Sequence, residues 1–227
     1  MRFLRRLIPA SWKRGIARRR YVRLMAKEDA FLRGKEIKLD DEHVRNATVL
    51  SGTAALLERL PKGGVVAEVG VAEGDLSASI LAINAPSTLH LIDLWGSSVA
   101  RFGPAAYGKV ASRFAGDVAS GRVRIHRGLS WDMLATLDDR SLDWVYLDAA
   151  HDYASVKRDL SAVLPKLKPL GLIVGDDYVM WAGQIGRYGV VEAINELCRD
   201  GGFEFVYLVM QRHMHLKYAI RRIGRRG

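Results

Sequence analysis

Three carboxylates stand where two strands are predicted to end. Residues 142–147 and 172–175 are short apolar runs, and Asp148 follows the first while Asp176 and Asp177 follow the second. Neighbouring parallel strands end at one edge of a sheet, so these groups would converge and repel one another unless a cation lies between them. Ligands that are all oxygen select a hard divalent ion, Mg²⁺ first and then Mn²⁺ or Ca²⁺. We predict a metal site here; the alternative is that Asp176 and Asp177 only cap the following helix.

His151 lies three residues beyond Asp148. An imidazole at this position could accept a proton from a hydroxyl group whose pKa a bound metal ion has lowered. Asp148 could share this catalytic role. Equally, His151 could be a structural hydrogen-bonding residue of the loop.

A glycine turn follows the first predicted strand. Residues 65–69 are mostly β-branched, and Gly70 and Gly74 then lead into a predicted helix, so backbone N–H groups and a positive helix end face the strand tip. The spacing differs from the G-x-G-x-x-G pattern that binds a dinucleotide pyrophosphate. Glu68 and Glu73 flank the turn, which favours a cationic ligand without a phosphate. The alternative is an ordinary tight turn between a strand and a helix.

Asp93 ends the second predicted strand, about twenty residues beyond the glycines, where a carboxylate can accept hydrogen bonds from the hydroxyls of a ribose. Trp95 follows directly. It could line a nucleoside site, or it could be half buried for packing alone.

The elements that position these residues alternate along the chain. A helix is predicted over 40–60, strands over 65–69, 88–93, 122–126, 142–148 and 172–175, helices from 76, over 105–120, 155–167 and 190–199, and a hairpin over 203–210 and 213–220. This order predicts a doubly wound, Rossmann-like α/β domain. Its mostly parallel sheet would have seven strands, one of them antiparallel in the C-terminal hairpin.

Composition favours a single domain in a reducing compartment. The 227 residues are 49% hydrophobic, which is enough for a sizeable core. The one cysteine, Cys198, excludes a disulfide framework and is expected to be a small core residue. No apolar run approaches the roughly 18 residues that a membrane span needs. We therefore expect a cytoplasmic protein.

The net charge of +10 is concentrated at the two ends of the chain: residues 1–27 hold ten Lys or Arg and no acid, and residues 221–227 hold four Arg. We predict a basic helical extension over 1–40 ahead of the α/β domain over 41–227. Arg5, Arg6 and Pro9 interrupt any signal-peptide core. The extension could pack on the domain or on a second subunit of a homo-oligomer, which we favour, lie on an anionic membrane as a peripheral contact, or touch nucleic acid.

The ordered motifs resemble a known family over residues 56–220. The motifs on which the resemblance rests are Glu68-x-Gly70-x-x-x-Gly74, Asp93, Gly128-x-Ser130, Asp148-x-x-His151-x-Tyr153 and Gly175-Asp176-Asp177-Tyr178. Together they resemble class I S-adenosylmethionine-dependent methyltransferases. Within that class they are most similar to the metal-dependent macrocin-type sugar O-methyltransferases and more distantly similar to the catechol type. Catechol-type enzymes have a lysine where this chain has His151, and an asparagine where it has Asp177.

The resemblance implies a role for each matched position. Glu68, Gly70 and Gly74 would shape the methionine end of the cofactor site, Asp93 would bind the ribose, Ser130 and Trp131 would lie near the adenine, and Asp148, Asp176 and Asp177 would hold Mg²⁺. Leu76 stands where many relatives have a hydroxyl residue for the carboxylate of the cofactor, which puts Ser77 in doubt for that role.

The expected activity is in-line transfer of a methyl group to a hydroxyl of a sugar unit, in a polysaccharide, a glycolipid or a glycosylated natural product. Tyr178, Trp181, Gln184, Arg187 and Tyr188 would complete the acceptor pocket, unless they form an ordinary surface loop. A catechol or another small phenol is the first alternative acceptor. A nucleic-acid methyltransferase that uses the basic ends is the second, although base methylation needs no metal triad. A binding module without catalysis also remains open.

Overall fold

The computed structural model describes residues 10–33, 37–182, 186–211 and 215–224. The chain divides into two compact units, Met1–Ile37 and Lys38–Gly227. The first contains α1 (Ala10–Leu32), a helix whose first turn holds no acidic residue. Within the described residues, no helix is both long and apolar enough to cross a bilayer.

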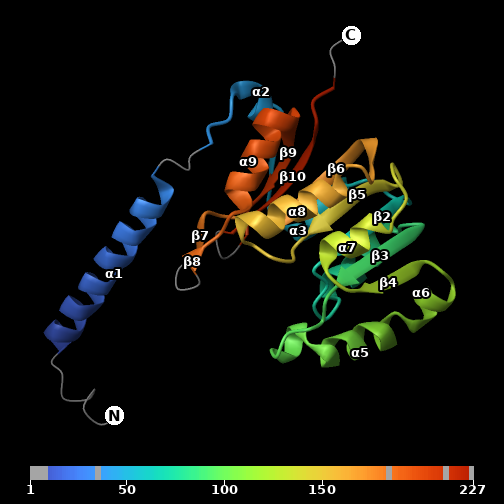
Figure 1. Cartoon of the computed structure of the whole chain (residues 1–227), viewed down its shortest axis with the longest axis horizontal. Coiled ribbons are helices and arrows are strands. Elements are labelled where there is room, and N and C mark those ends of the chain that lie inside the picture. The colour runs from blue at the N-terminus through green and yellow to red at the C-terminus, as the bar shows by residue number, and fades with distance from the viewer. Residues whose placement is uncertain (1–9, 34–36, 183–185, 212–214, 225–227) are drawn as a thin grey trace. The chain divides into compact units, whose positions relative to one another are not determined.

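The second unit is built on an eight-stranded sheet with the order β1-β9-β10-β6-β5-β2-β3-β4 (Figure 1). Its strands are β1 (Thr48–Leu50), β2 (Val65–Val69), β3 (Thr88–Asp93), β4 (Val123–Arg127), β5 (Leu142–Leu147), β6 (Leu167–Tyr178), β9 (Phe203–Val209) and β10 (Leu216–Arg222). β10 runs antiparallel to both of its neighbours, and the other pairs are parallel. The predicted Rossmann-like fold and its antiparallel hairpin strand are confirmed.

The eighth strand lies inside a segment that was predicted to be one helix. Residues 40–60 form α2 (Asp41–Val44), β1 and α3 (Thr53–Arg59) instead. Thr48 and Val49 have β-branched side chains, and they pair in parallel with Tyr207 and Leu208 of β9. This pairing with a distant strand overrides the helical spacing of the apolar residues.

The helix predicted over 105–120 is divided into α5 (Pro104–Arg113) and α6 (Ala115–Ala119). The division falls at Phe114, whose backbone leaves the helical region while its side chain is buried in the core. Core packing of one aromatic side chain thus ends the first helix.

Helices cover both faces of the sheet and form two hydrophobic cores. One core packs α7 (Ser130–Ala135), α8 (Tyr153–Val163) and α9 (Val190–Gly201) on one face, and Figure 1 shows α8 beside α9 there. The other core packs α3, α4 (Asp75–Asn84) and α5 on the opposite face. Cys198 is buried in the first core, as predicted. A short turn η2 (Ala100–Phe102) and a small hairpin of β7 (Trp181–Ala182) and β8 (Gly186–Arg187) complete the described elements.

Strand pairing brings the glycine turn against the end of β5. Val69 lies beside Leu147 in the parallel register, and the Asp148 N–H donates to the Val69 carbonyl at 2.8 Å. Gly70 has a φ of 90°, and a Cβ atom at this position would collide with the Asp148 carbonyl. Glycine is therefore required here on two grounds, its backbone conformation and the close approach of a second chain segment.

Candidate functional site

A cavity of about 700 Å³ opens at the carboxyl ends of β2, β3 and β5. Its lining includes these predicted site residues: Gly70, Asp93, Ser130, Trp131, Asp148, His151 and Asp177. Among the described residues, the predicted site members that do not line it are Glu68, Gly74, Asp176, Tyr178, Trp181, Arg187 and Tyr188. The fold therefore gathers about half of the predicted site around one cavity.

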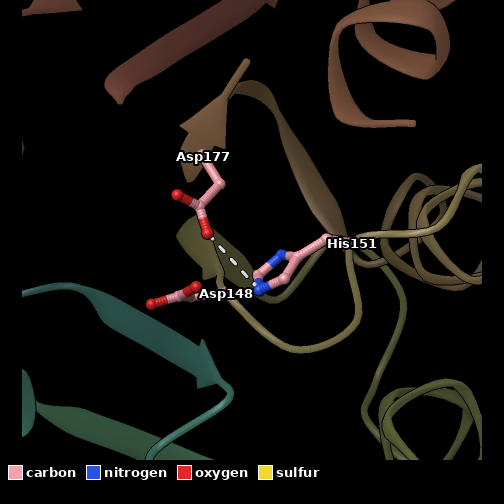
Figure 2. Close-up of side chains that lie close together, drawn as sticks. All are labelled: Asp148, His151 and Asp177. Carbon is pink, nitrogen blue, oxygen red and sulfur yellow. Dashed lines mark ion pairs between the residues drawn. The ribbon is translucent and has the colours of Figure 1, made fainter. Parts of the chain in front are cut away.

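Asp148, His151 and Asp177 form a cluster at one side of this cavity. Each offers one ligand atom, and these atoms all lie within 4.8 Å of one another. Figure 2 shows the two carboxylates and the imidazole facing a common point, with the Asp177 Oδ2 atom 3.4 Å from His151 Nε2. The Tyr188 ring stacks on the His151 ring at 4.9 Å with an interplanar angle of 13°, and this contact holds the imidazole in place.

His215 is a second histidine at Asp177, and the sequence did not single it out. Its Nδ1 atom lies 2.6 Å from Asp177 Oδ1. The antiparallel pairing that sets Leu216 opposite Tyr178 brings the two residues together. In the sequence, the only feature that could have indicated this contact is the position of His215 near the start of the second predicted hairpin strand. Asp177 itself has a φ of 53°, a strained conformation of the kind that often marks functional sites.

Asp176 lies outside this cluster, although the predicted metal triad includes it. The buried ammonium of Lys217 donates to Asp176 Oδ2 and, at 2.6 Å, to the Tyr146 hydroxyl. The Gln211 amide donates to Asp176 Oδ1 at 2.7 Å. Asp176 does not line the large cavity, although it lies near Asp148 and His151 in a small cavity beside it. Because Asp176 and Asp177 are both in β6, the alternative role as caps of a following helix is wrong.

The pKa values of Asp148 and Asp176 are shifted in opposite directions. Burial raises the pKa of Asp148 to about 8, and the negative charge of Asp176 acts in the same direction. Burial also opposes ionisation of Asp176, but the charge and the hydrogen bond of Lys217 outweigh it and lower the pKa of this group. Lys217 thus keeps Asp176 ionised in the interior, where it serves as an internal counter-ion.

Glu68 lies beneath the cavity rather than in its wall. Its side chain is buried, and its Oε2 atom accepts a hydrogen bond from the Ser77 hydroxyl of α4 at 2.5 Å. Burial raises the pKa of Glu68 to about 8. In this arrangement Glu68 joins β2 to α4, which supports the glycine turn from below. Gly74 contributes the left-handed residue that starts α4, with a φ of 81°.

Asp93 organises the glycine turn from the end of β3. Its Oδ2 atom accepts hydrogen bonds from the N–H groups of Val71 at 2.8 Å and Ala72 at 3.0 Å, and its Oδ1 atom accepts one from Trp95 at 2.8 Å. A carboxylate oxygen has two lone pairs, so Oδ1 retains one for a ligand hydroxyl. Trp95 is completely buried and its indole N–H donates to the Ala72 carbonyl, yet it also lines the cavity, so it packs in the core and borders the site at once.

The start of α7 forms the wall that was predicted to lie near an adenine. Trp131 lines the cavity, and the Arg158 guanidinium lies 5.2 Å from the centroid of its ring. The Ser130 hydroxyl donates to Asp159 at 2.5 Å, and burial raises the pKa of Asp159 to about 6. Ser130 therefore fixes α7 to α8, and Trp131 supplies an aromatic surface.

The predicted acceptor residues are divided between the core and a hairpin. Tyr178 donates its hydroxyl to Asn195 at 2.6 Å and packs against Phe205, so its predicted contact with an acceptor is replaced by a core contact. Trp181 and Arg187 face each other across the β7–β8 pair. Tyr188 is the member that touches the cluster, through its stacking on His151. Gln184 lies outside the described residues.

Comparisons with known proteins agree with this geometry. Residues 67–178 match the family model of a methyltransferase domain. No curated protein matches the chain. Among solved structures, a putative rRNA methylase from Clostridium thermocellum is similar over 75% of this chain and 93% of its own, with a TM-score of 0.58 and 12% identity.

Two further structures are similar to the same degree. A putative methyltransferase from Streptococcus mutans, in complex with SAH, covers 75% of this chain and 95% of its own, with a TM-score of 0.53 and 11% identity. A tRNA methyltransferase from B. subtilis covers 77% and 67%, with a TM-score of 0.53 and 13% identity. At such identities the likeness shows the fold, which is the Rossmann-like α/β fold of methyltransferases.

Proposed function

We propose that the protein is an S-adenosylmethionine-dependent O-methyltransferase that acts on a hydroxyl of a sugar unit. The observation that carries the proposal is the single cavity that joins Gly70, Asp93 and Trp131 to the cluster of Asp148, His151 and Asp177. The methyltransferase family match supports the choice of cofactor. The first part of the cavity would hold the cofactor, and the cluster would hold the reacting end of the acceptor.

The cofactor part of the cavity fits S-adenosylmethionine in size and charge. A volume of about 700 Å³ is in the range of small-molecule sites. Gly70 leaves room for a ligand beside the strand tip, Asp93 retains a lone pair for a ribose hydroxyl, and Trp131 offers a surface for an adenine. When bound, the cofactor supplies an electrophilic methyl group on a sulfonium. The Asp177 carboxylate gives this end of the cavity a charge that suits it, and a bound cation would favour the ionised form of Asp148, whose pKa burial raises to about 8.

The cluster also fits a divalent cation. Asp148, His151 and Asp177 would hold it through two carboxylate oxygens and one imidazole nitrogen, all within 4.8 Å. A mixed oxygen and nitrogen set suits Mn²⁺ as well as Mg²⁺, and suits Ca²⁺ less, because Ca²⁺ prefers oxygen alone. A cation in this position would lower the pKa of an acceptor hydroxyl.

The chain offers two proton acceptors at the reacting end. His151 is held between the Asp177 carboxylate and the Tyr188 ring, which fixes the direction of its Nε2 atom. Asp148 lies in the same cluster and becomes the acceptor if His151 is engaged elsewhere. The nitrogen of His151 that binds a cation cannot also accept a proton, so with a cation bound the second carboxylate oxygen of Asp148 would remove the hydroxyl proton, and without one His151 would. The cavity wall would hold the oxygen in line with the methyl group.

Aromatic and polar groups near the cluster favour a sugar over a flat phenol. Tyr188 lies at the cluster, and Trp181 and Arg187 come from the neighbouring β7–β8 hairpin. Such groups stack on a sugar face and bind its hydroxyls. A catechol is the alternative acceptor at the same site.

RNA methylation is the second candidate function. It is favoured by the basic helix α1, in which Arg14, Arg18, Arg19, Arg20 and Arg23 are all exposed, and by the RNA substrates named for two of the similar structures. The two candidates differ in whether RNA or a saccharide accepts the methyl group.

Isothermal titration with S-adenosylmethionine, with and without Mn²⁺ or Mg²⁺, tests the proposal. We expect the wild type to bind the cofactor and to bind the cation. Cation binding should be lost in Asp148→Asn and kept in Asp132→Asn, a variant of an exposed acid on α7. Absence of cofactor binding would overturn the proposal, whereas cofactor binding without any cation would remove only the metal. Transfer of a labelled methyl group to saccharides, catechol and total RNA then identifies the acceptor class.

A further inference from the structure

The cavity is rich in carboxylates and contains one strong base. Asp93, Asp148 and Asp177 line it, while Arg101 is the only lysine or arginine among its lining residues in the described chain. Arg101 belongs to η2, in a loop that closes on itself through bonds from Ser97 N–H to the Phe102 carbonyl and from Phe102 N–H to Val99. The loop thus presents a guanidinium to the cavity.

Arg101 is available to a ligand. Its guanidinium carbon lies 5.7 Å from the centroid of the Phe102 ring, and within the described residues the side chain makes no hydrogen bond or ion pair. A guanidinium that lies in a cavity wall without a hydrogen-bond partner can form two parallel hydrogen bonds to an incoming carboxylate.

Arg101 lies near the start of α4. A hydrogen bond from Arg113 is the main cause of the lowered pKa of Asp75, and the charge of Arg101 contributes to it. Gly70 and Ala72 of the glycine turn line the same cavity as Arg101. The guanidinium therefore shares this cavity with the glycine turn that precedes α4.

Other groups that could receive a carboxylate at this end are already occupied. Ser77 donates its hydroxyl to the buried Glu68. The N–H groups of Val71 and Ala72 donate to Asp93, and that of Gly70 donates to the Ile92 carbonyl. Residues 73–77 do not line the cavity. A carboxylate that entered here without a cationic partner would be repelled by the ionised acids of the cavity lining.

We propose that Arg101 binds the carboxylate of the methionine part of S-adenosylmethionine. This inference rests on the proposed function and adds to it the residue that recognises the amino-acid end of the cofactor. The fork of donors on the guanidinium matches the two oxygens of a carboxylate, and the acids of the cavity remain for the ammonium and sulfonium charges. Arg101 therefore selects a zwitterionic amino-acid end over a purely cationic one.

A matched pair of ligands tests the assignment. S-adenosylmethionine and decarboxylated S-adenosylmethionine differ only in the carboxylate, and both are titrated calorimetrically into the wild type, Arg101→Ala, Arg101→Gln and Arg113→Ala. Loss of a charge-assisted hydrogen bond should weaken S-adenosylmethionine binding by about 10-fold to 100-fold in both Arg101 variants. Binding of the decarboxylated ligand should not change. Arg113→Ala removes a nearby arginine that pairs with Asp75 outside the cavity, and should alter neither affinity.

The outcomes separate the two proposals. Equal losses for both ligands, or no loss for either, would overturn the role of Arg101 and leave the cofactor assignment intact. A wild type that binds neither ligand would overturn the proposed function itself. Circular dichroism of each variant shows whether it is folded, and Arg101→Gln keeps most of the side chain if Arg101→Ala disturbs the loop.

Discussion

The pH dependence of stability should reveal the role of Glu68. This residue was predicted to shape the cofactor site, but the structure buries it under the glycine turn with Ser77 as its hydrogen-bond donor. Burial raises its pKa from 4.5 to about 8. Between these values the folded protein retains a proton that the unfolded chain has lost, so the free energy of unfolding must fall as the pH rises.

The size of this effect follows from the shift. A pKa difference of about 3.5 units lowers the free energy of unfolding by about 5 kcal/mol once the pH is above 8. At pH 7, about 3 kcal/mol of this stability is already lost. Glu68→Gln cannot ionise, and its amide oxygen can still accept the hydrogen bond from Ser77. We therefore expect the gain in stability of this variant over the wild type to be largest at pH 9, smaller at pH 7 and close to zero near pH 5.

Urea unfolding at pH 5, 7 and 9, followed by tryptophan fluorescence, measures the difference. Glu58→Gln, at an exposed position on α3, is the matched control and should follow the wild type at every pH. Parallel pH profiles for Glu68→Gln and the wild type would refute the reasoning. If the variant instead bound S-adenosylmethionine less tightly with an unchanged pH profile, the predicted role in the cofactor site would be restored.

Three further changes test other parts of the structure. Lys217→Met leaves the ionised Asp176 buried without a counter-ion and should lower the free energy of unfolding by about 3 to 5 kcal/mol, while the double variant Lys217→Met, Asp176→Asn should recover much of this loss in urea titrations. Gly70→Ala forces a side chain against the Asp148 carbonyl at a positive φ, so we expect a loss of at least about 1 kcal/mol and weaker S-adenosylmethionine binding by calorimetry; an unchanged variant would contradict the close approach. Tyr188→Leu removes the ring that stacks on His151 and should lower kcat more than it raises KM, whereas Tyr178→Phe should reduce only thermal stability, because its hydroxyl binds Asn195.

Local sequence patterns were sufficient for the elements that lie next to the site. The run Val65–Val69, the strand that ends at Asp93 and the apolar run before Asp148 form strands close to the predicted bounds. These strands are buried on both faces, and such strands appear in sequence as short apolar segments bounded by turn residues. The glycine turn was equally visible, since Gly70 and Gly74 both adopt the positive φ that their residue type allows.

Contacts between distant segments decided which predicted residues reach the cavity. β1 formed inside a predicted helix because β9 offered it a partner more than 150 residues later in the chain. Tyr178 was predicted to contact an acceptor, but the packing of α9 turns it toward Asn195. Neither outcome leaves a signal in the residues adjacent to these positions.

The sequence by itself determined that acids end neighbouring strands beside a glycine turn, because strand ends and turns are set by residues only a few positions apart. It did not determine which acids share a ligand. The antiparallel pairing of β10 with β6 brings Lys217 to the Asp176 carboxylate and His215 to the Asp177 carboxylate. These contacts between segments far apart in the sequence engage Asp176 with Lys217 and leave Asp148, His151 and Asp177 as the cluster in the cavity.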